Sequence, residues 1–221
     1  MYPKYEDVLN AKLFSYTQMN PGLPEYMDGL DSIIAYCARV SNPSNQANKD
    51  THSKLIRYLI KHKHWSPFEM VNVCLEVTST RDIVRQLLRH KSFCFQEFSG
   101  RYASNSDLGF CLRECRLQDS ENRQNSLNND DPGLALWWED AQTNAINSAS
   151  HTYKTAIKYG IAKEQARAVL PEGNTLSRVY INGSIRSWIH YLEIRTGAET
   201  QKEHRLMGQK CSNEIVKVFP M

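Results

Sequence analysis

Apolar residues recur at two different spacings along the chain, and each spacing predicts a different element. In KLIRYLIKHKH (54–64) they fall on one face at helical spacing, which predicts an amphipathic helix that starts near Thr51. Segment 29–41 predicts a shorter helix that ends near Ser41. In VNVCLEVTST (71–80) apolar and polar residues alternate, as expected of a strand with one buried face. Between them, Ser66-Pro67 ends the helix, and Pro67 suits the first position of a new turn.

Helical spacing returns after this strand and dominates the second half of the chain. Ser79 and Asp82 suit a helix start, and the residues that follow form an apolar stripe of Ile83, Val84, Leu87 and Leu88. Further helices are predicted over 134–159, 164–170 and 176–218, the last with a break at Thr196-Gly197. Segment 117–133 is almost entirely polar, which predicts a mobile surface loop. Without internal repeats, the pattern predicts one α+β domain over residues 1–221.

Composition is that of an ordinary globular protein and narrows the possible functions. The chain is 41% hydrophobic and 23% charged, and its formal net charge of +3 is slight for a nucleic-acid-binding domain. It has no run of about eighteen apolar residues, as a membrane span needs, and its first residues lack the apolar core of a signal peptide. The six cysteines form no CxxC pair, which disfavours a structural metal site or a disulfide framework. We therefore expect a cytoplasmic protein without a metal or membrane span.

The stretch RHKSFCFQEFSGRY (89–102) combines charges and aromatic residues in a way that neither a core nor a solvated loop requires. Arg89 and Arg101 can each offer a fork of N–H donors to a phosphate. Ser99-Gly100 adds a hydroxyl and an unobstructed backbone N–H. Glu97 would be stable there only if it is paired or hydrogen-bonded. We expect this stretch to form a helix end and a loop. Its residues suit either an anion-binding site or a structural network of ion pairs.

Neighbouring residues allow further alternatives. Arg81, Arg85 and Arg89 are spaced four residues apart, so they share one helix face. For Arg81 and Arg85 the alternative to ligand binding is a solvated cationic face. Cys94 could be a nucleophile activated by nearby cations, although its position between two phenylalanines favours a small buried thiol.

Five segments in order resemble the flavin-dependent (ThyX-type) thymidylate synthases. The stretch 89–102 resembles their signature RHRxxSxNxxSxRY, with Lys91, Cys94 and Gln96 in place of arginine, serine and asparagine. The other four segments are CARVSNP (37–43), HKHWSPFEM (62–70), QARAVLP (165–171), and SIRSWIHYLEIR (184–195) followed by Glu199, Gln201 and Glu203. The resemblance therefore spans about residues 29 to 210.

The resemblance implies a fold, a reaction and a set of cofactors. The fold would be α/β, with a central, mostly antiparallel sheet flanked by helices, assembled as a homotetramer. The enzyme would be a methyltransferase that converts dUMP to dTMP. Carbon would come from 5,10-methylenetetrahydrofolate and hydride from non-covalently bound FAD that NADPH has reduced. The reaction would use no protein nucleophile. Each site would be built from several subunits of the homotetramer, and no nucleic-acid partner is implied.

The resemblance also assigns site residues. Those for dUMP are Gln86, Leu87, Leu88, Arg89, Glu97, Phe98, Ser99, Gly100, Arg101, Arg167 and Arg195. Those for FAD are His64, Ser66, Glu69, Arg89, His90, Lys91, Glu97, Ser184, Arg186 and His190. Arg195 would be catalytic, because a fixed cation at the uracil edge would stabilise the developing pyrimidine anion.

Other interpretations of these residues remain open. His64 could be a surface histidine before the turn at Pro67, and Arg186 could pair with Glu193 or Glu199. Lysine is a point charge that cannot reproduce arginine's planar fork, so Lys91 would balance ligand charge with looser geometry. The whole chain could instead be another flavoprotein acting on a pyrimidine or folate, a single-strand-binding module, or an inactive structural relative.

Overall fold

The computed structural model describes residues 1–23, 27–103 and 108–220, and its centre is a four-stranded sheet. In spatial order the strands are β1 (Asn10–Tyr16), β2 (Asn72–Thr80), β6 (Leu176–Ser184) and β3 (Cys94–Glu97). Every neighbouring pair runs antiparallel, and β2 and β6 pair along their full length. The expected α+β class with a mostly antiparallel sheet flanked by helices is therefore confirmed.

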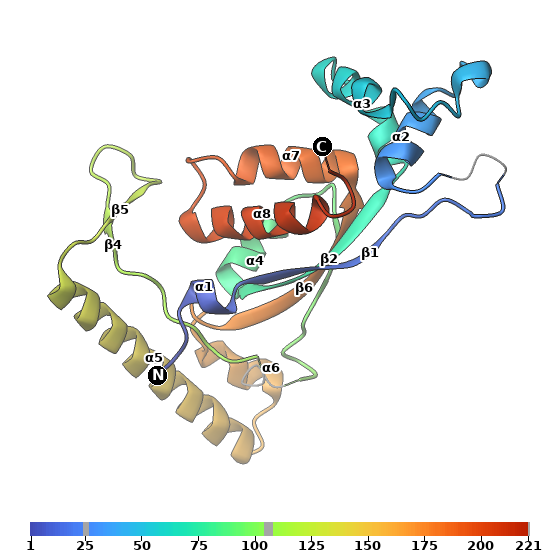
Figure 1. The fold of residues 1–221 in the computed structure, drawn as a ribbon. Helices are drawn as coiled ribbons and strands as arrows, with labels where there is room; N and C mark the ends of the chain where they lie inside the picture. The colour runs from blue at the N-terminus through green and yellow to red at the C-terminus, as the bar shows by residue number, and fades with distance from the viewer. Residues whose placement is uncertain (24–26, 104–107, 221) are drawn as a thin grey trace.

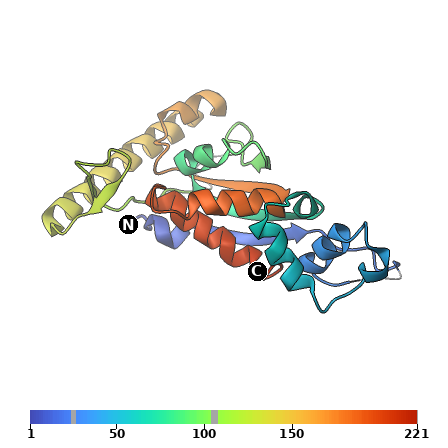
Figure 2. The same ribbon diagram turned by 90° about the horizontal axis from the view of Figure 1, so that it is seen from above.

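Helices lie on both sides of the sheet and beyond one end. α4 (Arg81–Leu87), α7 (Ile185–Arg195) and α8 (Lys202–Ile215) lie on one face, and α6 (Lys163–Ala166) lies on the opposite side (Figure 1). α2 (Leu30–Ala38) and α3 (His52–Lys61) pack on each other beyond one end of the sheet, and the long α5 (Pro132–Lys158) runs past the other end (Figure 2). The remaining elements are α1 (Tyr5–Val8), the hairpin β4 (Arg116–Gln118) with β5 (Ser126–Asn128), and the 3₁₀ turns Pro43–Asn45, Ser66–Glu69 and Arg167–Val169.

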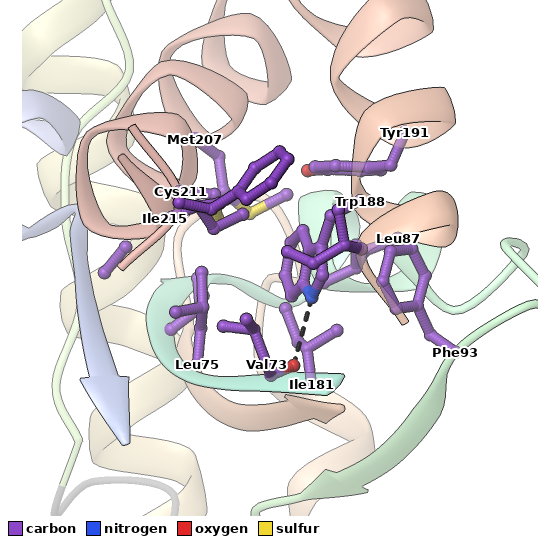
Figure 3. Packing of buried hydrophobic residues seen from close by; sticks show 14 of the residues in the cluster. Val73, Leu75, Leu87, Phe93, Ile181, Trp188, Tyr191, Met207, Cys211 and Ile215 are labelled. Carbon is purple, nitrogen blue, oxygen red and sulfur yellow. Dashed lines mark hydrogen bonds between the residues drawn. The ribbon is translucent and has the colours of Figure 1, made fainter. Parts of the chain in front are cut away.

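Alternation along β2 and β6 determines which face the helices cover. The residues of the covered face are fully buried, namely Val73, Leu75, Val77, Val179 and Ile181. Trp188 of α7 lies over them, and its indole N–H donates to the Val73 carbonyl at 3.0 Å (Figure 3). This bond satisfies the one polar group of a side chain that is only 1% exposed. The packing of α7 on the sheet thus has both an apolar and a directional component.

Several sequence predictions are confirmed. The helices expected over 29–41, after Thr51, after Ser79, and over 134–159 correspond to α2, α3, α4 and α5, and the strand over 71–80 corresponds to β2. Segment 164–170 is helical as predicted, as α6 followed by a 3₁₀ turn. The turn at Pro67 is also present.

The prediction of helix from residue 176 onwards is wrong for its first nine residues, which form β6. Their burial alternates with period two, because Val179, Ile181 and Gly183 face the core while Arg178 and Asn182 are exposed. The apolar residues of the following helix, α7, concealed that shorter period. From Ile185 onwards the prediction is confirmed, including the interruption between α7 and α8.

Two further expectations are corrected. Residues 94–97 form strand β3 rather than a helix end and loop. Segment 117–133 is exposed as expected but not unstructured, since β4 and β5 pair within it. The Asp119 carboxylate accepts from the backbone N–H groups of Glu121 and Asn122 and closes the turn. Local hydrogen bonds of this kind order a polar segment without burying apolar surface. Strand β1 has no counterpart among the predictions.

No helix in the described ranges is both long and apolar enough to cross a membrane.

Gly183 of β6 provides a test of how the stretch 89–102 is attached. A Cβ at this position would lie 2.3 Å from a carbon of the Phe93 ring, which is itself packed against Trp188 with 4.7 Å between ring centroids. The ring cannot move away freely, because only 7% of Phe93 is exposed. We expect Gly183→Ala to lower the free energy of unfolding by about 1–3 kcal/mol, measured by urea denaturation.

Gly173→Ala is the matched control, because a Cβ there meets nothing within 4 Å. Both substitutions restrict the unfolded chain equally, so their difference reports the clash with Phe93. Equal stability of the two variants would show that Phe93 does not hold this strand.

Candidate active site

Arg195 and His90 meet where α7 approaches the end of α4. The Arg195 Nε–H donates to His90 Nε2 at 2.9 Å, so this ring nitrogen carries no proton. Burial, then the charges of Arg195 and Arg89, lower the pKa of His90, which keeps the ring neutral. Among the described residues, no side chain or carbonyl engages the terminal nitrogens of Arg195. The histidine thus fixes the guanidinium by one edge and leaves its outer fork of donors free.

A chain of hydrogen bonds joins α4, α7 and the start of α8. Gln201 Nε2 donates to the Glu203 carboxylate at 2.9 Å, and Gln86 Nε2 donates to Gln201 Oε1 at 2.8 Å. The two His204 ring nitrogens lie 3.2 Å from Gln86 Oε1 and from the Tyr191 hydroxyl.

The carboxylate end determines the direction of this chain. An ionised carboxylate only accepts, so Gln201 must turn its amide nitrogen toward Glu203 and its oxygen toward Gln86. Gln86 must then donate to Gln201 and accept from His204 Nδ1–H. His204 Nε2 is left as an acceptor for the Tyr191 hydroxyl. The amide of Gln86 therefore has one orientation, and its second N–H has no partner among the described residues.

Glu203 is held by two arginines, Arg113 before the hairpin and Arg116 at its first residue. Arg116 donates to it at 2.6 Å, and Arg113 lies 3.5 Å away. Burial opposes ionisation of this carboxyl, but the hydrogen bond from Arg116 and the charges of both arginines outweigh that effect and lower its pKa. Arg113 in turn donates to Asp82 at 2.6 Å. The charge that directs the amide chain is thus paired on two sides.

A second group of predicted residues lies where the turn Ser66–Glu69 meets α7. Glu69 forms an ion pair with Arg186, and the ring of His190 packs edge-on against Trp65 with centroids 4.7 Å apart. Ser184 caps α7 by accepting from the Ser187 N–H. Arg186 therefore pairs with another predicted site residue rather than with Glu193 or Glu199. Glu69 and Ser66 are exposed, and so is His64, whose ring lies beside Tyr58 and His62.

Glu97 lies apart from both groups, on the edge strand β3. The register pairs it with Val179, which places its side chain on the same sheet face as the buried core. Ser177 donates to it at 2.7 Å, and Arg81 is 3.9 Å away. Arg81 is thus committed to the sheet, and only 19% of its side chain is exposed. The alternative of a solvated cationic face fits Arg85, whose side chain is 63% exposed, but not Arg81.

The loop after β3 forms a fourth group on the far side of the sheet. Arg101 pairs with Glu164 of α6 at 3.4 Å, and its backbone N–H donates to the Ser99 hydroxyl at 3.4 Å. Gly100 is buried, and Phe98 and Arg167 are half-buried. Within the described ranges no hydrogen bond or ion pair joins this group to Arg195.

Three of the predicted cations are not committed within the chain. The side chains of Arg89, Lys91 and Arg167 make no hydrogen bond or ion pair with a described residue, and the first two are exposed. Both follow α4 directly, on either side of His90. This short segment can therefore offer two adjacent cations to an anionic ligand without breaking an existing bond.

The expectation that Cys94 is buried is wrong, and the packing of the core limits how Leu87 and Leu88 could contact a ligand. Leu87 is fully buried in the core, so only its backbone could contact a ligand, and Leu88 is partly buried against the same cluster. Cys94 is exposed rather than buried, because the register that turns Phe95 toward the core turns Cys94 outward opposite Asn182. Burial raises the pKa of the Cys37, Cys74, Cys111 and Cys211 thiols, to about 12 for the last two. High pKa values of this kind do not suit a nucleophile.

Sequence reasoning gave no site role to Gln201 or His204 of the hydrogen-bonded chain, although Gln201 was noted among the residues that carry the resemblance. They are three apart at the start of α8, so they share one face of that helix. The spacing was visible in the sequence, but nothing there indicated that this face meets α4.

Comparisons with known proteins agree on one family. A model of the family described as "Thymidylate synthase complementing protein" matches residues 22–221 of this chain. The chain is 43% identical over 212 residues to a probable flavin-dependent thymidylate synthase of Paramecium bursaria Chlorella virus 1, covering 96% of each. It is 46% identical over 190 residues to the flavin-dependent thymidylate synthase of Synechocystis sp., covering 86% of each. Its fold is similar to the UMP/dUMP methylase PolB of Streptomyces cacaoi bound with 5-Br dUMP, at a TM-score of 0.79 and 25% identity over 95% of this chain and 90% of that one.

The neutral, buried state of His204 predicts a pH dependence of stability. Burial, then the charges of Arg195 and His90, lower its pKa to about 3, against 6.5 in an unfolded chain. Between these values the unfolded state binds one more proton, so stability is lost as pH falls below 6.5. We expect wild type to lose about 2 kcal/mol more than His204→Asn between pH 6.5 and 5, measured by urea denaturation at fixed protein concentration.

His151→Asn, which removes an exposed histidine of α5, is the matched control. If His204→Asn and wild type lost stability in parallel, His204 would be protonated in the folded protein as readily as in the unfolded chain. The bond between His204 Nε2 and the Tyr191 hydroxyl would then run in the opposite direction to the one assigned.

Proposed function

The chain belongs to the thymidylate synthase complementing protein family of flavin-dependent thymidylate synthases, and we propose that it is an enzyme that converts dUMP to dTMP. The methylene carbon comes from 5,10-methylenetetrahydrofolate, which leaves as tetrahydrofolate. FAD, when bound and reduced by NADPH, supplies the hydride. One observation carries the proposal beyond family membership: His90 fixes Arg195 by a single edge, and the outer donors of Arg195 have no partner among the described residues.

Arg195 is positioned to stabilise negative charge on a pyrimidine. Loss of the N3 proton places negative charge on the uracil ring, C5 then donates that electron density to the carbon donor, and a guanidinium that is already oriented needs no reorganisation to meet the anion. Gln86 lies at the end of α4, four residues before His90, and one N–H of its oriented amide has no partner within the described ranges. Together the two residues can recognise one edge of the base without a covalent bond to the protein. The raised pKa values of four of the cysteines agree with a reaction that uses no thiolate.

The phosphate of dUMP requires cations that are not neutralised within the chain. Among the described residues, Arg89 and Arg167 meet this condition, and the side chain of Arg101 has one exposed ion pair there, with Glu164. Ser99 and Gly100 lie beside Arg101 and contribute a hydroxyl and a backbone N–H. Phe98 and the backbone of 87–88 complete this set of proposed contacts.

FAD also fits the residues that are present. Its pyrophosphate is anionic, and Arg89 and Lys91 are exposed and unpaired among the described residues, on either side of His90. Glu97, Ser184, Arg186 and His190 lie near the ends of β3 and β6 and on α7, and His64, Ser66 and Glu69 precede β2. The exposed Glu69–Arg186 pair can open to polar groups of a ligand at little cost, because an exposed ion pair is worth only about 0–1 kcal/mol.

We further propose that the protein acts as a homotetramer in the cytoplasm. The phosphate-facing residues 99–101 and Arg167 lie with α6, on the opposite side of the sheet from Arg195 (Figure 1). A second copy that brought its own 99–101 loop to Arg195 would complete the site. α5 offers an apolar surface for such contacts, since Leu136 is 63% and Trp137 61% exposed.

The proposal is tested with purified protein, dUMP, methylenetetrahydrofolate and NADPH. We expect flavin absorbance after addition of FAD, and dTMP as the product. Arg195→Lys keeps the charge but loses both the bond to His90 and the planar fork, so the turnover number should fall about 100-fold or more while FAD still binds. Arg123→Lys, in the exposed hairpin loop, is the control. Full activity in Arg195→Lys would exclude Arg195 from the chemistry, and a protein that takes up no FAD would overturn the proposal.

Lys91 tests the departure from the family signature. Arginine at this exposed position would add a second donor for the same phosphate without losing any contact within the described residues. We expect Lys91→Arg to tighten FAD binding by about three- to tenfold, measured by flavin fluorescence titration. Unchanged FAD affinity, dUMP affinity and turnover would show that residue 91 does not face the ligands.

A further inference from the structure

A donor-rich groove lies between the end of α2 and the outer face of α3. Its volume is about 470 Å³. Half of its lining comes from CARVSNP (37–43) and the turn that follows, a segment that none of the assigned roles uses. The lining residues are Ala38, Arg39, Ser41, Asn42, Asn45, Thr51, Lys54, Leu55 and Tyr58.

The chemistry of this lining favours an anion. Its described residues include two cations, Arg39 and Lys54, five hydroxyl or amide side chains, and no carboxylate. Arg39 is only 7% exposed, and its guanidinium donates to the carbonyl of Asn48 and to the Thr51 hydroxyl, the latter at 2.7 Å. It therefore contributes a fixed positive charge to the wall, while Lys54 is exposed and can move to a ligand.

The cationic surface continues along α3. Lys54, Arg57 and Lys61 are spaced three and four apart, so they share one face over a rise of about 10 Å. All three are exposed, and none forms an ion pair with a described residue. Segment 51–64 contains no acidic residue at all. The opposite face of the helix is apolar, with Ile56 fully buried, so this orientation is fixed by the core.

An aromatic path connects this surface to the proposed flavin site. Tyr58 lines the groove and is 51% exposed. The centroid of its ring lies 4.3 Å from that of His62 and 6.1 Å from that of His64. His64 immediately precedes the turn that carries Ser66 and Glu69. A molecule that reached the flavin with one end could thus extend past His64 and Tyr58 to α3.

We propose that the groove and the cationic face of α3 bind the γ-glutamyl tail of the folate co-substrate. This rests on the proposed function, which requires a folate whose carbon-bearing ring lies at the flavin and whose glutamyl end points away. A glutamyl chain carries one carboxylate per residue in series, which matches single cations placed in a row along a helix. A phosphate is instead bound by donors that converge on one point, and the three cations of α3 do not converge.

The test compares 5,10-methylenetetrahydrofolate bearing one and five glutamates, with dTMP formation as the assay. We expect the KM of wild type to be about five- to tenfold lower for the pentaglutamate, and this preference to weaken as salt is raised. In Lys54→Gln/Arg57→Gln the ratio of the two KM values should fall toward one. Lys154→Gln/Lys158→Gln removes two exposed lysines from α5 and should keep the wild-type ratio.

Each outcome is informative. A wild-type enzyme without preference for the pentaglutamate, or a double variant that keeps it, overturns the proposal. A double variant in which only the KM for NADPH rises assigns the surface to a phosphate of the nicotinamide cofactor and also overturns it. Formation of dTMP from the monoglutamate in all variants shows, independently, that the proposed function holds.

Discussion

The buried carboxylate of Glu203 is the constraint on which the candidate site depends. A charge that is 3% exposed can persist only with partners, and Arg113 and Arg116 supply them from a segment distant in sequence. Because the carboxylate must accept, it sets the direction of every hydrogen bond from Gln201 to Tyr191. A structural ion pair thereby determines the orientation of the Gln86 amide, which would meet the substrate. Neutralising Glu203 would free that amide to rotate without removing a single contact from the site itself.

The sheet imposes the second constraint, through the parity of β6. Alternate residues of this strand face the core, and Gly183 among them leaves the space that the Phe93 ring fills. Phe93 anchors the start of β3, and the register then turns Glu97 inward and Cys94 outward. Strand β6 ends at Ser184, which caps α7. This cap fixes where the helix that carries Arg186, His190 and Arg195 begins. Residues far apart in the sequence are placed by one strand.

These constraints explain what the sequence could and could not predict. Elements with one clear period were predicted correctly, as α3 and β2 show. β6 was not predicted, because its short alternation runs directly into the amphipathic helix α7. Its exposed polar residues, Arg178 and Asn182, are four apart and therefore also fit helical spacing. The residues for the site were found by their resemblance to a known signature, but their partners were not. That Glu97 would bind Ser177, or Arg195 would bind His90, depends on strand register and helix packing, and neither is encoded locally.

The site residues divide into those that the fold holds and those that it leaves free. Gln86, His90 and Arg195 are oriented by bonds within the chain, which suits recognition of a planar base whose charge changes during reaction. Arg89, Lys91 and the cations of α3 are exposed and unpaired among the described residues, which suits flexible anionic groups that do not react. A lysine in place of arginine is therefore tolerable at position 91 for the same physical reason that it would not be at position 195. In the proposed site the geometry of the donors would matter at the base, whereas charge would be sufficient at the phosphate and the tail.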